Sequence, residues 1–359
     1  MVLASPPSRT ASVELPPLPP FQPHPWFRGG HLQTLAGFLR ADRGEPPSAE
    51  IRVGLPDGDV LTVLISTPAP WKAGDPVVLM VHGLCGSADV SYVSRPAHRL
   101  IRQGWLTARV NLRNAGTGEG LSKKSYHAGQ SDDLRAVAEE LARRYPGSPI
   151  ALAGFSLGGN LVLKLAAEAA DRPVTNLDRV VAVNPPIDLY AAARFIERTA
   201  ARFYQLRFLK QLRAMVRRHE RDFPELPRID LSRIRTLAAF DDAYTAKVHG
   251  FLDARDYYVR SSSRPILGRI PIPGLILHAI DDPFIPPEAF RDLELPADVR
   301  LELLPDGGHL GYVSQQPWMG DHRWMDARLV TWLAEHWGEH PPWTDCPRQH
   351  DDPTRDGGR

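Results

Sequence analysis

A serine with closely spaced glycines on both sides is the feature of this sequence best suited to covalent chemistry. Gly154-Phe155-Ser156-Leu157-Gly158 follows an apolar run typical of a strand (150–155) and leads into a stretch typical of a helix (158–170). A sharp strand-to-helix turn needs glycines, because side chains there would collide with neighbouring elements. Such a turn presents the serine hydroxyl at a helix N-terminus, which favours developing negative charge. We predict that Ser156 is a nucleophile; the alternative is a glycine-rich turn with an incidental serine.

A histidine in a glycine-rich loop is the predicted activator of this serine. A serine hydroxyl is a weak nucleophile at neutral pH and needs a base to take its proton. His309 stands in Asp306-Gly307-Gly308-His309-Leu310, directly after the last predicted strand at 301–304. In strand-turn-helix serine sites the order along the chain is Ser, then Asp or Glu, then His. We predict His309 as the general base; a surface histidine is the alternative.

Two adjacent aspartates compete for the role of the acid that orients the histidine. Asp281 and Asp282 follow the predicted strand at 275–279 and precede Pro283-Phe284-Ile285-Pro286. Either carboxylate could fix the tautomer of the imidazole and stabilise the imidazolium. We choose Asp282, because an aspartate at this spacing before the Ile-Pro pair is the usual arrangement in such sites. Asp281 is then expected to cap or solvate the loop.

A second glycine-containing segment is suited to stabilising an oxyanion. His82-Gly83-Leu84-Cys85-Gly86-Ser87 follows the apolar strand at 77–81. We expect the backbone N–H groups of Leu84 and Leu157 to bind the tetrahedral oxyanion together. His82 is expected to pack and form hydrogen bonds. Cys85 suggests thiol catalysis, but it lacks a strand-turn-helix setting, and a buried or incidental cysteine is the better interpretation.

The remaining polar clusters predict no further site. Asp241, Asp242 and His249 could be considered as metal ligands, but their spacing fits no known metal site, and contacts between the cap and the core explain them better. We therefore expect no metal and no organic cofactor. The basic run 213–221 is most simply a solvated helix face, with contact to a membrane surface as the alternative.

Alternating strands and helices must position these residues. Right-handed βαβ units and a mainly parallel central sheet flanked by helices are the expected result. Residues 186–271 contain no strong strand, but they do contain helical stretches. An insertion at this point would lie over the carboxyl ends of the strands, and we expect a helical cap. Strands are predicted at 51–53, 60–66, 77–82, 106–112, 150–155, 180–184, 275–279 and 301–304, and helices at 131–144, 158–170 and 322–337.

Composition and chain ends limit the choice of function. The formal charge of +1 and the hydrophobic fraction of 43% give no reason to expect binding to nucleic acid or a membrane-spanning segment. The first residues lack a secretory signal and the cysteines number two, so a reducing cytoplasm is expected. We predict a proline-rich extension at 1–25 that packs little, a catalytic domain with its cap at 26–340, and a flexible tail at 341–359.

Together these motifs resemble the YheT-like branch of the α/β-hydrolases, which is similar to several eukaryotic α/β-hydrolase-domain proteins. The resemblance covers about residues 20–340, and two departures, Cys85 and Ala128, lie where members often carry an acidic residue and a serine. The segments that carry it are the serine turn extended by Gly159-Asn160, His82-Gly83-Leu84, Tyr126-His127-Ala128-Gly129, Pro25-Trp26-Phe27-Arg28-Gly29-Gly30-His31-Leu32-Gln33-Thr34, Phe240-Asp241-Asp242-Ala243-Tyr244-Thr245-Ala246, Asp281-Asp282-Pro283-Phe284 and Gly307-Gly308-His309.

The resemblance implies a capped α/β-hydrolase with a triad formed by Ser156, Asp282 and His309. It also implies hydrolysis of carboxylic esters, with lipid-like acyl esters among the substrates. Some relatives carry an N-terminal membrane anchor, and we expect none from the residues of this sequence. An acyltransferase or a thioesterase would use the same acyl-enzyme, and a non-catalytic binding protein on this fold is the alternative from another class.

Overall fold

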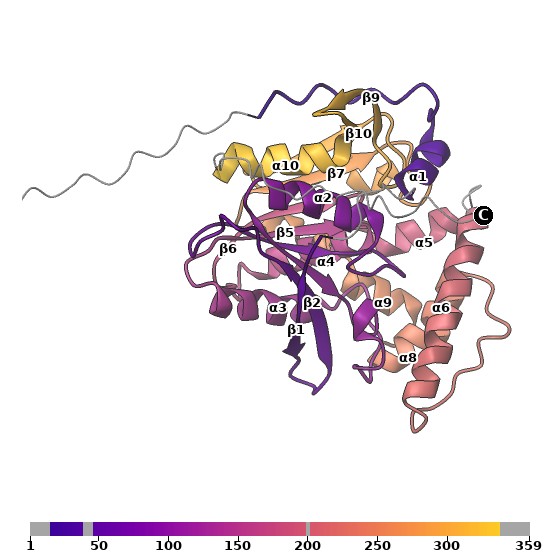
Figure 1. Cartoon of the computed structure of the whole chain (residues 1–359). Coiled ribbons are helices and arrows are strands. Elements are labelled where there is room, and N and C mark those ends of the chain that lie inside the picture. Colours follow the sequence, from indigo (N-terminus) through magenta and orange to yellow (C-terminus); the bar gives the residue numbers. More distant parts are fainter. Residues whose placement is uncertain (1–14, 39–45, 199–201, 338–359) are drawn as a thin grey trace, which may run out of the picture.

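A mostly parallel sheet forms the centre of the molecule. The computed structural model describes residues 15–38, 46–198 and 202–337, and within them an eight-stranded sheet runs in the order β1-β2-β4-β3-β5-β6-β7-β8 (Figure 1). The pairs β1–β2 and β2–β4 are antiparallel and all later pairs are parallel, so the sheet is mainly parallel, as predicted. The strands are β1 (Ala49–Gly54), β2 (Val60–Ser66), β3 (Val77–Val81), β4 (Leu106–Asn111), β5 (Ile150–Phe155), β6 (Leu177–Val183), β7 (Gly274–Ala279) and β8 (Val299–Leu304).

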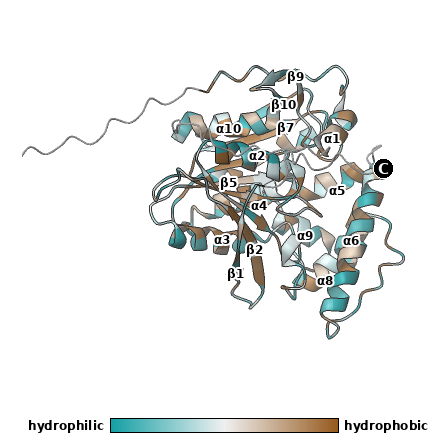
Figure 2. Cartoon of the chain, in the orientation of Figure 1, coloured by the Kyte–Doolittle hydropathy of each residue, from teal (hydrophilic) through white to brown (hydrophobic). Residues whose placement is uncertain are grey.

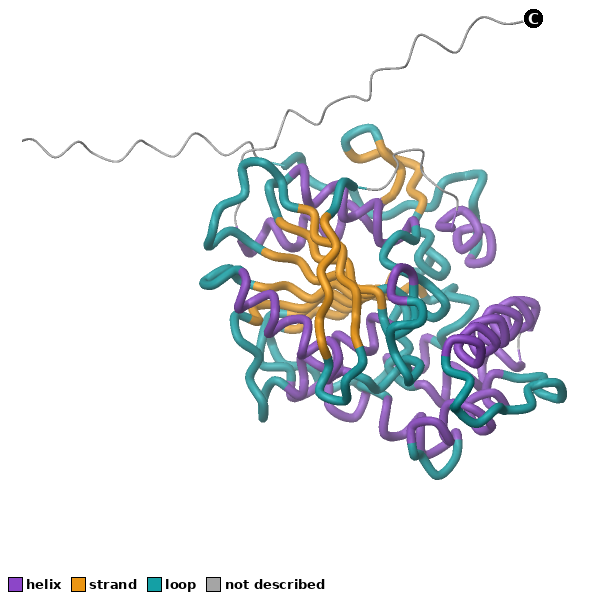
Figure 3. The backbone as a smooth tube through the Cα atoms, turned by 60° about the horizontal axis from the view of Figure 1, so that its bottom comes forward, coloured by secondary structure: helices purple, strands orange, loops and turns teal. Residues whose placement is uncertain are grey.

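Helices cover both faces of this sheet, which explains why its central strands are continuously apolar. In β3, Leu79 and Val81 face one hydrophobic cluster, while Val78 and Met80 face the other. The view in Figure 3 shows helices on either side of the strands. The first cluster includes α3 (Ser131–Arg144) and α4 (Leu157–Glu168), and the second includes α2 (Ser91–Arg102) and α10 (Trp324–Trp337).

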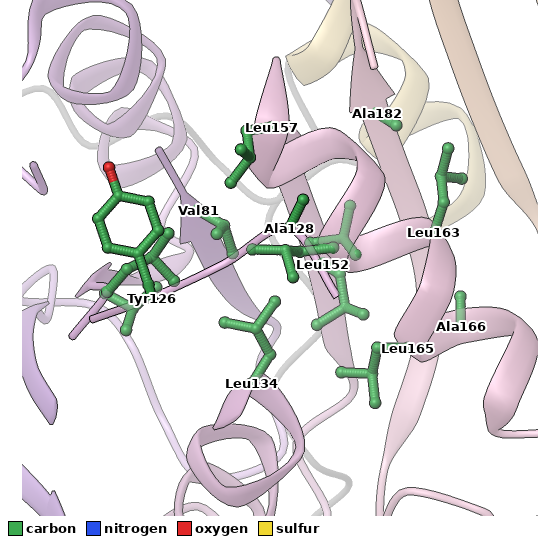
Figure 4. Packing of buried hydrophobic residues seen from close by; sticks show 14 of the residues in the cluster. Val81, Tyr126, Ala128, Leu134, Leu152, Leu157, Leu163, Leu165, Ala166 and Ala182 are labelled. Carbon is green, nitrogen blue, oxygen red and sulfur yellow. The ribbon is translucent and has the colours of Figure 1, made fainter. Parts of the chain in front are cut away.

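The apolar faces of α3 and α4 fix the serine-bearing turn against the sheet. Leu134 of α3 and Leu165 of α4 lie beside Leu152 of β5 and Val81 of β3 (Figure 4). All four side chains are completely buried. Burying a leucine side chain contributes about 2 kcal/mol, so this packing holds the end of β5 and the start of α4 in one arrangement.

A helical insertion connects β6 to β7, where the sequence predicts a cap. The buried face of its longest helix packs on the first cluster through Leu209, Leu212 and Val216. The insertion gathers at one end of the sheet (Figure 1). Its elements are α5 (Leu189–Arg198), α6 (Arg202–Asp222), α7 (Leu237–Phe240), the π-helical turn η2 (Asp241–Thr245), α8 (Ala246–His249), α9 (Ala254–Ser261) and the 3-10 helix η3 (Arg264–Arg269).

Several elements differ from those expected from the sequence. The helix expected at 322–337 begins at Trp324, because 321–323 form β10 (Asp321–Arg323) in a hairpin with β9 (Val313–Trp318). The helices α1 (Gly30–Phe38) and α2 were not predicted, nor were the 3-10 helices η1 (Gly116–Gly118) and η4 (Pro287–Phe290). None of the helices in the described ranges is both long and apolar enough to cross a bilayer.

The proline-rich segment near the N-terminus also departs from expectation. Leu18 and Phe21 pack against the second hydrophobic cluster. The indole N–H of Trp324 donates to the carbonyl of Pro19 at 2.8 Å. Prolines keep this segment extended but leave its carbonyls free as acceptors, so residues 15–25 lie along the domain instead of packing little. Residues 1–14 and the predicted tail at 341–359 lie outside the described residues.

Candidate active site

The turn that carries Ser156 connects β5 to α4. Ser156 has φ 53° and ψ −123°, a conformation rarely adopted by residues other than glycine. A Cβ atom at Gly158 would lie 2.3 Å from the carbonyl oxygen of Val81, and one at Gly154 would lie 2.3 Å from the carbonyl oxygen of Gly158. Both positions therefore require glycine. The sequence motif thus folds into the strained turn that was expected from it.

Three side chains far apart in the sequence meet at this turn. The Nε2 atom of His309 lies 2.8 Å from the Oγ atom of Ser156, and its Nδ1 atom lies 2.8 Å from an oxygen of Asp282. The hydrogen-bond network assigns the Nδ1–H tautomer, in which Nε2 is free to accept the serine proton. His309 and Asp282 are both buried. The structure thus brings together the three residues selected from the sequence.

Of the two candidate aspartates, only Asp282 contacts the imidazole. It also accepts hydrogen bonds from the backbone N–H of Phe284 at 2.7 Å and from the side chain of Asn184 at 2.7 Å. Burial by itself raises the pKa of Asp282, but the charge and hydrogen bond of His309 outweigh burial and keep this pKa below its usual value. Asp281 turns away and accepts from the backbone N–H of Gly308 at 2.8 Å.

Helix α1 positions the loop that carries His309 through side-chain hydrogen bonds to the backbone of the loop. The Thr34 hydroxyl accepts a hydrogen bond from the backbone N–H of His309 at 2.9 Å and donates to the carbonyl of Gly30 at 2.6 Å. The Gln33 side chain donates to the carbonyl of Val313 at 3.0 Å and accepts from its N–H at 2.7 Å. The sequence showed the His31-Leu32-Gln33-Thr34 segment only as part of a resemblance, without a role. Asn184 was missed, although a polar residue directly after buried β6 was the available signal.

The segment after β3 carries a free N–H group beside the serine. The N–H groups of Gly83 and Cys85 donate to the hydroxyls of Tyr92 at 3.1 Å and Tyr126 at 2.7 Å. Between them, the N–H of Leu84 donates to no acceptor in the part of the chain that the structure describes, and the same is true of Leu157. A Cβ atom at Gly83 would lie 3.0 Å from the Ser156 Cβ, so this segment adjoins the serine.

Two groups in this segment are neutral. Burial lowers the pKa of His82 to about 4, and its ring contacts the Gly83 carbonyl at 2.8 Å and the Leu112 N–H at 3.2 Å. These contacts agree with a structural role. Burial raises the pKa of Cys85 to about 12, so its sulfur stays a thiol at neutral pH. A thiol with so high a pKa is a poor candidate for a nucleophile.

Two hollows meet at Ser156 and His309. One, about 130 Å³ in volume, extends beneath the cap and is lined mainly by apolar side chains, among them Leu189, Ile196 and Leu212. The other, about 390 Å³, opens between α1 and α6, and Arg207 and Gln211 contribute to its wall. The serine therefore lies where a small, mainly apolar space joins a larger, more polar one.

The residues considered as metal ligands do not converge. Asp241 lines the apolar hollow and accepts hydrogen bonds from the hydroxyls of Tyr258 and Thr245, both at 2.7 Å. Asp242 is exposed and accepts from the backbone N–H of Ala254. The His249 ring packs against His127, with ring centroids 4.4 Å apart. No group of three or more candidate ligands is found in the described ranges.

Comparison with known proteins assigns the chain to a family. Residues 76–315 match the family model described as the alpha/beta hydrolase fold. The chain belongs to the α/β-hydrolase family. This α/β-hydrolase is 32% identical over 321 residues to the putative esterase YheT of Escherichia coli (strain K12), covering 88% of this chain and 93% of YheT. The resemblance to the YheT-like branch is thereby confirmed.

More distant relatives of this α/β-hydrolase include named lipases. It is 30% identical to a monoacylglycerol lipase of Saccharomyces cerevisiae (strain ATCC 204508 / S288c), over 72% of this chain and 59% of the lipase. It is 28% identical to the phospholipase ABHD3 of Mus musculus, over 73% of this chain and 64% of ABHD3. Among solved structures, the hydrolase GrgF of Penicillium sp. sh18 aligns with a TM-score of 0.55 at 21% identity, over 81% of this chain and 99% of GrgF. This last likeness shows the fold alone.

Proposed function

We propose that this protein is a serine hydrolase that cleaves carboxylic esters, including lipid-like acyl esters, through an acyl-enzyme intermediate. The observation that carries the proposal is the chain of two 2.8 Å contacts from Ser156 through His309 to Asp282. An imidazole that accepts from a hydroxyl and donates to a buried carboxylate is the arrangement that turns serine into a nucleophile.

The first half of the reaction acylates the serine. His309 Nε2 takes the Ser156 proton as Oγ attacks the ester carbonyl carbon, and Asp282 stabilises the imidazolium that forms. The carbonyl oxygen becomes an oxyanion, which accepts hydrogen bonds from the N–H groups of Leu84 and Leu157. His309 then gives its proton to the leaving alcohol, and the acyl group remains on Ser156.

The second half releases the acid by the same groups. A water molecule takes the place of the alcohol and loses a proton to His309 as its oxygen attacks the acyl carbonyl. The tetrahedral intermediate occupies the same pair of N–H donors. When it collapses, His309 returns the proton to Ser156 and the carboxylic acid departs. No part of this cycle requires a metal ion or an organic cofactor.

The two hollows suggest separate binding sites for the acyl chain and the alcohol of the ester. We assign the acyl chain to the smaller, mainly apolar hollow under the cap and the alcohol to the larger, more polar hollow beside Arg207. Apolar walls favour an aliphatic chain, because its burial is worth about 0.8 kcal/mol for each methylene. The names of the two lipase relatives agree with a lipid-like ester as substrate.

A panel of esters with matched thioesters tests the proposal. The purified chain is expected to hydrolyse the esters, with a rate that depends on acyl length, and the Ser156→Ala variant is expected to lose this activity by at least about 10³-fold. Adding a primary alcohol separates hydrolysis from acyl transfer, because a transferase would form a new ester. Ester hydrolysis unchanged in Ser156→Ala would contradict the proposal.

A further inference from the structure

The helix α1 is oriented against the usual rule for a surface helix. It buries Gln33, Thr34, Ala36 and Gly37. Its large apolar side chains point outward: Leu32 is 48% exposed, Leu35 is 52% exposed and Phe38 is 41% exposed. A helix that only stabilised the fold would bury the leucines and the phenylalanine and expose the polar residues.

The polar face of α1 has a structural reason to be buried, whereas the apolar face has no such reason to be exposed. Gln33 and Thr34 form the hydrogen bonds that hold the histidine loop. The contact is close, because a Cβ atom at Gly37 would lie 2.6 Å from the carbonyl oxygen of Leu310. The hydrogen bonds to the histidine loop explain why the polar face of α1 is buried, but they do not explain why its apolar face is exposed. A cluster of exposed apolar residues is typical of a surface that binds a protein, a ligand or a membrane.

The start of α6 continues this apolar surface. The rings of His31 and Tyr204 stack with centroids 5.8 Å apart, so the two helices touch. On α6, Phe203 is 75% exposed and Leu206 is 57% exposed. Both helices lie on the same side of the molecule in Figures 1 and 3. We call the surface formed by Leu32, Leu35, Phe38, Phe203 and Leu206 the apolar rim.

Part of the apolar rim lines the entrance to the serine. Leu35 and Phe38 from α1, together with Arg207 from α6, line the hollow of about 390 Å³ that reaches Ser156 and His309. A substrate that enters through this opening passes between the two helices. The rim is therefore placed where a lipid leaving an aggregate would reach the active site first.

A row of basic residues extends from the rim along α6. Arg207, Lys210, Arg217 and Arg221 are exposed, and they form no ion pair with acidic residues in the described ranges. Their spacing of three, four and seven residues places them on the helix face that carries Phe203. Figure 2 shows α6 as mainly hydrophilic along its length. Arg218, on a neighbouring face, is instead paired with Glu119 at 3.0 Å.

We propose that the apolar rim and the basic row of α6 dock this protein on the surface of an anionic lipid assembly. Aromatic and aliphatic side chains next to unpaired basic residues are the pattern of helices that lie in a membrane interface. The apolar rim would insert among the acyl chains, and the basic row would contact lipid phosphates. The inference rests on the proposed function in one respect, namely that the ester is lipid-like.

Vesicle sedimentation tests the inference without turnover. The Ser156→Ala chain is mixed with vesicles of phosphatidylcholine alone or of phosphatidylcholine with phosphatidylglycerol. Binding is expected to be stronger with phosphatidylglycerol and to weaken in high salt. Each basic residue near an anionic surface strengthens binding about fivefold, so Lys210→Gln/Arg217→Gln/Arg221→Gln is expected to weaken it by at least about tenfold. Phe203→Ser/Leu206→Ser is expected to weaken binding to both vesicles by about tenfold.

Matched controls use residues of the same kinds elsewhere on the surface. Val259→Ser/Leu252→Ser removes apolar residues that are 61% and 92% exposed, and Arg52→Gln/Arg102→Gln removes exposed charges. Both control variants are expected to bind as the parent does. Unaltered melting temperatures show that each variant is folded.

Three results of the vesicle experiment would overturn the inference: no vesicle binding, equal loss in the controls, or rim and basic-row variants that bind like the parent. A dimer that forms without lipid and dissociates in Phe203→Ser/Leu206→Ser would also overturn it, because a second copy would then cover the rim. Hydrolysis of water-soluble esters by the native chain is measured separately, so failure of the proposed function is distinguishable from failure of docking.

Discussion

The backbone N–H of His309 donates a hydrogen bond of 2.9 Å to the hydroxyl of Thr34, a residue 275 positions earlier in the chain. The histidine loop is thus positioned from the N-terminal side as well as by the sheet. Thr34 touches neither the reacting atoms nor a substrate site, so it is a positioning residue. Its effect on the reaction is expected to pass entirely through the placement of the imidazole.

Replacing Thr34 separates this hydrogen bond from the packing around it. Thr34→Val keeps the shape of the side chain but leaves the buried N–H of His309 without an acceptor, and we expect kcat to fall by about 10- to 100-fold with little change in KM. Thr34→Ser keeps the hydroxyl and is expected to retain activity within about threefold. Steady-state kinetics measure both, and a valine variant as active as the serine variant would contradict the assignment.

The two adjacent aspartates are predicted to differ sharply. Asp282→Asn replaces the carboxylate that accepts from the His309 ring, and kcat is expected to fall by about 10⁴-fold because the wrong tautomer becomes favoured. Asp281→Asn keeps an acceptor for the Gly308 N–H and is expected to lose less than about tenfold. Equal losses of kcat in the two variants would contradict the assignment of Asp282 as the acid on the basis of its 2.8 Å contact with His309.

Tyr126, whose hydroxyl accepts a hydrogen bond from the Cys85 N–H, is predicted to position the oxyanion site. Tyr126→Phe removes the hydroxyl acceptor while keeping the ring, so the backbone around Leu84 becomes less constrained. We expect kcat to fall about tenfold and binding of a boronic-acid inhibitor to weaken in parallel. Tyr190, which is 48% exposed, provides the control Tyr190→Phe. Loss of inhibitor binding without loss of kcat would argue against this role.

Asp241 is predicted to make stability depend on pH. Burial raises its pKa to about 6, against an ordinary value near 4 in the unfolded chain. At lower pH both states hold the proton; as the pH rises toward the folded value only the folded state keeps it, so the free energy of unfolding falls. The loss is expected to be about 3 kcal/mol by neutral pH.

Urea unfolding at a series of pH values measures this effect. Asp241→Asn is expected to flatten the decrease between acidic and neutral pH, because the amide does not ionise. Asp242→Asn is the matched control, since Asp242 is exposed. A decrease that remains equally steep in Asp241→Asn would assign the pH dependence to other groups.

The core of the sheet was predictable because its strands are buried on both faces. The β3 strand is completely buried, so its apolar run is uninterrupted in the sequence. The helices α1 and α2 were not predicted, because both bury polar side chains: α1 buries Gln33 and Thr34, and α2 buries charged residues among its apolar ones. In α2, Arg95 is 5% exposed and pairs with Asp326 at 3.0 Å, and Pro96 lies inside the helix. Periodicity cannot identify a helix whose buried polar groups find partners only in the folded chain.

The residues of the candidate active site differ in how much of their role the sequence predicts. The turn at Ser156 requires glycines because a Cβ atom there would collide with the backbone, and a local sequence motif is therefore enough to predict the turn. The choice of Asp282 over Asp281 depends on which carboxylate faces the imidazole across the loop. Asn184 and Thr34 act through contacts with segments more than a hundred residues away, at Gly308 and His309. The local sequence can mark Asn184 as a polar residue at the end of a buried strand, but it does not show which segment Asn184 or Thr34 contacts.

The central claim is that His309 and Asp282 make the Ser156 hydroxyl nucleophilic, and covalent labelling by a fluorophosphonate tests it most directly. Intact-mass and peptide analysis of the native chain is expected to show a single adduct on the peptide that contains Ser156. Ser156→Ala is expected to remain unlabelled, and His309→Ala is expected to label at least about 10³-fold more slowly. An adduct on another residue, or labelling at an unchanged rate in either variant, would contradict the claim.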